Sequence, residues 1–160
     1  MADNKTLFYE ELRNTARQFR EESFENSENI RHLRDAALSV MQLVYVARTE
    51  GLLSLEDAVE RERIRELVCG DELSRMIELI LDGTDPGVVE NTSMIRYYSQ
   101  NYTGLKGFLF LFFLDITLRI QSGEPLMDLE KYVKAYMPDE IIPYLDEAKT
   151  EREKKRQRGD

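Results

Sequence analysis

The stretch FLFLFFLDITLRI, residues 108–120, contains the longest apolar run of the chain and limits the folds that can hold it. Seven consecutive apolar residues place apolar side chains on every face of a helix, so such a helix must be covered on all sides. A membrane span needs about 20 mostly apolar residues, whereas Asp115 ends this run and Arg119 follows it. We therefore expect a helix over 105–121 that does not span a membrane.

Two positions for this helix are compatible with the sequence. It is either the central helix of the domain or part of an interface that assembles a homodimer. The residues that this choice concerns are Phe108, Phe110, Phe112 and Phe113. Asp115 also has two interpretations, an i,i+4 ion pair with Arg119 or a buried acid with a raised pKa.

The segments around this helix also show helical spacing. Between residues 33 and 47, apolar residues recur at alternating spacings of four and three, which places them on one helix face. The chain has only eight glycines and four prolines, and we find no sustained strand pattern. These features predict an all-α, single-domain bundle of six to eight helices, built from helical hairpins.

Three glycine-containing corners separate the predicted helices: ARTEGLLSLE (47–56), LDGTDPGVVE (81–90) and QSGEPLMDLE (121–130). Gly51 and Gly83 suit the positive φ that often ends a helix, and Ser54 and Asp85 are the expected N-caps. The first and third corners resemble each other. Either stacked repeats of one hairpin or capping chemistry alone explains this resemblance.

The first corner is expected to pack tightly. Leu52, Leu53 and Leu55 would anchor it in the core, and the helix that follows is expected to run from Ser54 to about Cys69. Cys69 is the only cysteine, so an internal disulfide is excluded.

Charge divides the chain into three parts: a charged N-terminal helix (1–28), a helical core (29–148) and a basic C-terminal tail (149–160). The formal net charge is −9, and without the basic tail the remainder is still more acidic. Such a body repels nucleic acid, so we expect no nucleic-acid partner. The tail is either a solvated helix end or a contact for phosphate or an acidic partner.

Catalytic machinery is not evident in the sequence. His32 and Cys69 are the only residues of the types that dominate zinc sites, and no glycine-rich phosphate loop is present. We therefore expect no enzyme activity, no metal and no cofactor. The alternative, a small-ligand or metal-dependent enzyme, needs a pocket formed by Asp115 together with three tyrosines, Tyr97, Tyr98 and Tyr102.

A family resemblance covers roughly residues 33–100. ARTEGLLSLE, followed about 25 residues later by MIELILDGTDPGVVE (76–90), resembles the cytoplasmic segment of the flagellar motor stator protein MotA family. The resemblance implies a bacterial, motility-associated helical module that faces a flagellar rotor component. Within it, the arginine before the glycine and the glutamate that ends the motif make charge contacts with the rotor, which implies that Arg48 and Glu56 bind a partner.

The chain departs from that family in lacking its membrane helices, so we expect a cytoplasmic, non-enzymatic protein rather than a proton-conducting stator subunit. Arg48 and Glu56 are expected to be exposed. Their charges also suit their own helix ends, Arg48 in a last turn and Glu56 in a first turn, so fold stability alone is the competing explanation. The alternative function is a helical-repeat scaffold or homodimer unrelated to motility.

Overall fold

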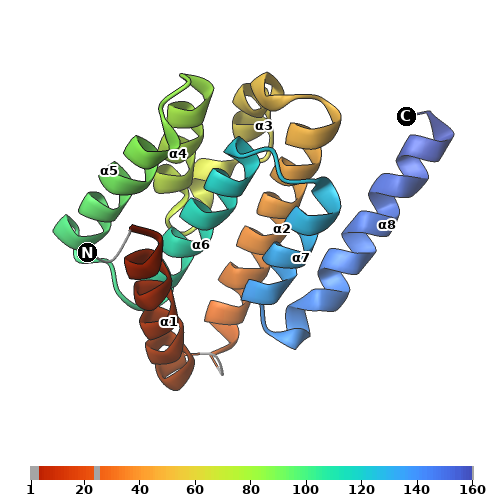
Figure 1. The fold of residues 1–160 in the computed structure, drawn as a ribbon. Coiled ribbons are helices and arrows are strands. Elements are labelled where there is room, and N and C mark those ends of the chain that lie inside the picture. The colour runs from red at the N-terminus through yellow and green to blue at the C-terminus, as the bar shows by residue number, and fades with distance from the viewer. Residues whose placement is uncertain (1–3, 24–25, 160) are drawn as a thin grey trace.

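The computed structural model describes residues 4–23 and 26–159. Eight α-helices form this part of the chain: α1 (Asn4–Ser23), α2 (Ser27–Thr49), α3 (Leu55–Arg61), α4 (Gly70–Leu81), α5 (Pro86–Ser99), α6 (Gly104–Gln121), α7 (Leu126–Tyr136) and α8 (Ile142–Arg158) (Figure 1). Short 3-10 turns cover Leu52–Ser54, Ile64–Glu66 and Asp139–Ile141. The predicted all-α bundle of helical hairpins is confirmed.

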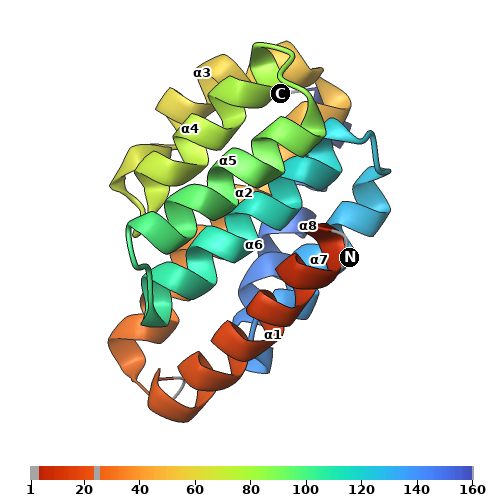
Figure 2. The same ribbon diagram turned by 60° about the vertical axis from the view of Figure 1, so that its left-hand side comes forward.

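Helix α6 occupies the centre of the bundle. It packs against α1, α2, α4, α5 and α7, and Figure 2 shows it running between α5 and α1. Every residue from Gly107 to Thr117 is buried, including the four phenylalanines named above. The central-helix interpretation is therefore confirmed, and these phenylalanines are not available to a dimer interface.

Aromatic rings from neighbouring helices cover α6. Phe19 of α1 stacks on Phe108 with ring centroids 5.2 Å apart, and Phe112 contacts Tyr136 of α7 at 4.9 Å. Burying one such ring contributes about 1.5–3 kcal/mol. The charged N-terminal helix is thus attached to the core through its narrow apolar stripe, which includes Phe8 and Phe19.

The α4–α5 and α6–α7 corners close their helices in the same way and lie at the same end of the bundle (Figure 1). Gly83 and Gly123 have φ values of 78° and 84°. In each corner the residue after the glycine donates its N–H to a carbonyl five residues earlier, which is the Schellman arrangement. Asp85 caps α5 by accepting the N–H of Gly87 at 2.9 Å, as predicted.

The α2–α3 corner differs from the prediction in two respects. The Ser54 hydroxyl does not cap α3 but donates to the carbonyl oxygen of Glu50 at 3.1 Å. Leu55 is buried and Leu52 packs on the core, but Leu53 is 78% exposed. A 3-10 turn has three residues per turn, so residues 52 and 55 share one side and Leu53 points away.

The expected helix from Ser54 to Cys69 is also wrong. Helix α3 ends at Arg61, Arg63 has a positive φ of 53°, and α4 starts at Gly70. A continuous helix would place Ile64 nine residues, or about two and a half turns, after Leu55, on the opposite face. The break allows Ile64 and Leu55 to be buried together.

Gly70 is the residue that this break requires. A Cβ atom at Gly70 would lie 1.9 Å from the carbonyl oxygen of Ile64. We expect Gly70→Ala to lower the free energy of unfolding by about 3 kcal/mol, because the backbone must shift. Urea denaturation followed by circular dichroism measures this loss.

The matched control is Gly87→Ala in the first turn of α5, where the new Cβ meets only the Asp85 side chain. Its unfolding free energy should stay within about 1 kcal/mol of the native value. Equal effects of the two substitutions would contradict a close contact between Gly70 and the Ile64–Glu66 turn.

Candidate functional site

Arg48, one of the two predicted partner-binding residues, lies in the last turn of α2 and is partly buried. Its guanidinium donates from Nε to the carbonyl oxygen of Glu124 at 2.6 Å and from Nη2 to that of Ile120 at 2.6 Å. The last carbonyls of a helix have no partner within the helix. Arg48 therefore satisfies the end of α6, and the expectation that it is exposed is wrong.

A second side chain makes the same kind of contact at this end of the bundle. Gln121, the last residue of α6, donates from Nε2 to the carbonyl oxygen of Thr84 at 2.7 Å. Arg48 thus attaches α2 to the α6–α7 corner, and Gln121 attaches α6 to the α4–α5 corner. Arg48 and Gln121 both lie in corners that the sequence predicts. The sequence does not show which carbonyl groups accept their hydrogen bonds, because those carbonyls are distant in the chain.

Glu56, the other predicted residue, is exposed in the first turn of α3. It makes no hydrogen bond or ion pair with any residue that the structure describes, and Arg48 and Glu56 are not paired with each other. The fold separates the two residues: Arg48 faces the α6–α7 corner, and Glu56 lines a groove between α3 and α4.

This α3–α4 groove has a volume of about 500 Å³. The side chains around it are Leu53, Glu56, Val59, Glu60, Arg65, Ser74, Ile77, Glu78, Leu81 and Asp82. Four of them are carboxylates, and the only cation, Arg65, lies 3.9 Å from Glu78 and also donates to Ser74. The groove therefore combines acidic side chains with an apolar floor, and the exposed Leu53 stands at its edge.

Asp115 belongs to a separate polar cluster around the second half of α6. It is 6% exposed and accepts hydrogen bonds from Arg119 Nε at 3.0 Å and from the Tyr136 hydroxyl. The predicted i,i+4 ion pair is confirmed. Arg119 also pairs with Glu124 at 3.0 Å and lies over the Tyr132 ring, 3.5 Å from its centroid.

Proton affinities in this cluster follow from burial and charge. Burial and the neighbouring Asp115 carboxylate both raise the pKa of Tyr136 above its ordinary value. Burial lowers the pKa of Arg119, but Asp115 and Glu124 outweigh burial and raise it above its ordinary value. The cluster therefore holds a protonated phenol and a charged guanidinium against one buried carboxylate.

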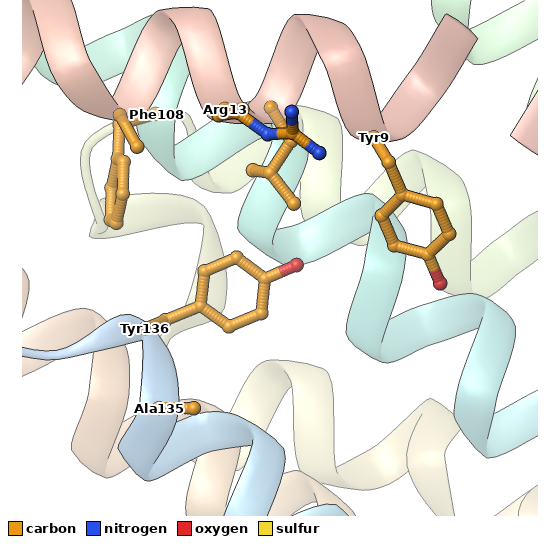
Figure 3. Close-up of a pocket in the computed structure, with 7 residues that line it drawn as sticks. Tyr9, Arg13, Phe108, Ala135 and Tyr136 are labelled. Carbon is orange, nitrogen blue, oxygen red and sulfur yellow. The ribbon is translucent and has the colours of Figure 1, made fainter. Parts of the chain in front are cut away.

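Asp115 and the three tyrosines of the enzyme alternative line different cavities. Asp115 lines one cavity of about 350 Å³, while Tyr97, Tyr98 and Tyr102 line another of about 170 Å³ beside α1. A third cavity of about 370 Å³ lies between α1 and α7, and Figure 3 shows Tyr136 extending into it from α7. Its phenol already donates to Asp115.

The chain was compared with known proteins, and no family model, no curated protein and no solved structure matches it. Among the described residues, no helix is long and apolar enough to cross a membrane. Within the same residues, no cluster of three or more histidine, cysteine and acidic side chains is arranged to hold a metal ion.

The contacts of Arg48 generate a stability prediction. We expect Arg48→Ala to lower the unfolding free energy by about 2 kcal/mol, because carbonyls at the end of α6 lose a charged donor. Arg48→Lys should recover only part of this loss, since an ammonium cannot reproduce the fork of a guanidinium. Chemical denaturation gives both values.

Glu56→Ala is the comparison at the other predicted position, and its effect should stay within about 0.5 kcal/mol. If Arg48→Ala were equally neutral, its carbonyl contacts would contribute nothing to stability, and the residue would be available to a partner.

Tyr136 generates a prediction on pH. The Tyr136 phenol has a higher pKa in the folded protein than in the unfolded chain, where its pKa is near 10.0. The resulting stabilisation is complete below pH 10 and is lost as the pH rises above it, at up to about 1.4 kcal/mol per pH unit. Tyr136→Phe should therefore show a shallower loss of stability between pH 10 and pH 12 than the native protein.

Denaturation midpoints across this pH range test the expectation, with Tyr144→Phe, an exposed position on α8, as the matched control. A slope that changes equally in the two variants would show that Tyr136 has no special part in the alkaline transition.

Proposed function

We propose that this protein acts by binding another protein, without catalysis, and that the α3–α4 groove receives the partner. The observation that carries the proposal is Leu53, which is 78% exposed at the edge of a groove with four carboxylates. The short 3-10 turn fixes this leucine in an outward direction. A single exposed apolar side chain is common on protein surfaces, but here Leu53 adjoins a groove that combines apolar side chains with carboxylates, and an apolar centre with a polar rim is typical of protein-binding sites.

The chemistry of the groove indicates the kind of partner. Val59 and Ile77 form part of an apolar floor, while Glu56 and Glu60 lie in the acidic lining. This combination is complementary to an amphipathic helix that carries apolar residues on one face and lysine or arginine beside them. Charge complementarity would guide the encounter, and the apolar contacts would supply most of the affinity.

Two further points narrow the choice of partner. The basic tail 149–160 of a second copy contains no leucine, isoleucine, valine or phenylalanine, so it matches the charge of the groove but not its floor. The resemblance of residues 33–100 to the MotA family supports a flagellar rotor or motor component as the partner. In this proposal Glu56 contacts that component, whereas Arg48 supports the fold.

The test uses a photoreactive benzoylphenylalanine in place of Leu53 in the native cell. We expect irradiation to link the protein to one discrete partner. The same substitution at Ile95, which is 67% exposed on α5, is the matched control and should not capture that partner.

The captured protein must then bind in purified form through a basic amphipathic segment. Glu56→Lys together with Glu60→Lys should weaken that binding by about tenfold or more, because two favourable charge contacts become repulsive. Equal capture from position 95, or affinity unchanged by the two substitutions, would refute the groove as the binding site. A captured partner from outside the motility apparatus would remove the motor assignment alone.

A further inference from the structure

A second groove lies on the other side of α3, between α2 and α8. This α2–α8 groove has a volume of about 610 Å³, and four cationic side chains line it: Arg61, Arg152, Lys155 and Arg156. Its carboxylates are Glu50 and Glu62, so cations outnumber acids by two. The chain as a whole carries a net charge of −9, which makes this local excess of positive charge distinctive.

Arg152 is the side chain that most needs an explanation. It is partly buried against α2, where its guanidinium carbon lies 5.5 Å from the centroid of the Tyr45 ring and Nη1 donates to Gln42 Oε1 at 3.5 Å. No carboxylate of the described residues lies within ion-pairing distance of it. Burial also lowers the pKa of Arg152 below its ordinary value. The carboxylates of Glu130, Glu153 and Glu62 favour its charge from a distance, but none of them forms the close ion pair that a partly desolvated guanidinium usually has.

Neighbouring cations on α8 face the same space. Lys155 and Arg156 are three and four residues after Arg152, so the three side chains share one face of the helix. Neither Lys155 nor Arg156 forms an ion pair within the described part of the chain. Arg61 at the end of α3 lines the groove from the opposite wall and lies 3.6 Å from Glu62. Two separate elements thus direct positive charge into one concavity.

We propose that the α2–α8 groove binds a small, multiply charged molecule that carries phosphate groups. The excess of two positive charges suits an anion with two or more negative charges, since a single carboxylate would balance only half of it. The planar guanidinium fork matches the geometry of phosphate oxygens. The volume falls within the range of small-molecule sites in proteins. This site is independent of the α3–α4 groove.

Isothermal titration calorimetry with inorganic tripolyphosphate tests the proposal at low ionic strength. We expect saturable one-to-one binding that weakens as salt is added. The double substitution Arg152→Gln and Lys155→Gln should reduce the affinity by about tenfold or more, because charged hydrogen bonds to the anion are lost. Circular dichroism of the variant verifies that it is folded.

The matched control is Lys154→Gln, which removes one positive charge from the same helix at an exposed residue that lies 3.8 Å from Glu151. It should leave the affinity within about twofold of the native value, because it removes a positive charge from α8 without touching the site. Equal weakening by this control, or titration without saturation, would overturn the proposal.

A parallel titration with ATP identifies what is recognised. Equal affinity for ATP and tripolyphosphate supports recognition of the phosphate chain alone, and tighter binding of ATP supports an additional contact with the nucleoside. A single-stranded RNA oligonucleotide is the competing class of ligand. If only RNA binds, and if its affinity grows with its length, the groove is a nucleic-acid contact and the small-molecule proposal is wrong.

Discussion

The fold depends on the burial of α6. A helix that is apolar on every face is stable only when neighbours cover it all round, so the other helices are arranged by the need to enclose it. The two charged side chains in its second half, Asp115 and Arg119, pair with each other and hydrogen-bond to tyrosines from α1 and α7. Arg48 donates to the carbonyl oxygen of Ile120 near the end of α6 and to that of Glu124 in the corner that follows. Tyr136 meets both the hydrophobic and the polar requirement of this helix, because its ring packs on Phe112 and its hydroxyl donates to Asp115.

Features controlled by local chemistry could be predicted from the sequence. A helix over 105–121 that must be covered on all sides follows from its composition, which left a central position and a dimer interface both open. The Asp115–Arg119 pair follows from i,i+4 spacing, and the cap at Asp85 from its position before Pro86. Each depends on residues within about one helical turn of one another. The exposed position of Glu56 was also predicted, from the motif that resembles the MotA family.

Features that depend on distant packing could not be predicted. The chain between Arg61 and Gly70 contains neither proline nor an internal glycine, so no local signal marks the break that lets Ile64 reach the core. Leu53 resembled an anchor because its neighbours are leucines, and only the geometry of the 3-10 turn separates it from them. Arg48 looked like a surface charge because its acceptors lie more than 70 residues away. The two grooves likewise depend on how α3 packs against α4 and how α2 packs against α8.

The side-chain contacts at the corners have a consequence for cooperativity. Arg48 and Gln121 each bond a main-chain carbonyl that belongs to a different hairpin. If one hairpin frayed at this end, a polar group of its neighbour would be left without its partner. We therefore expect α2, the α6–α7 corner and the α4–α5 corner to open together rather than separately. Two long polar side chains thereby couple turns that would otherwise be the most independent parts of a helical protein.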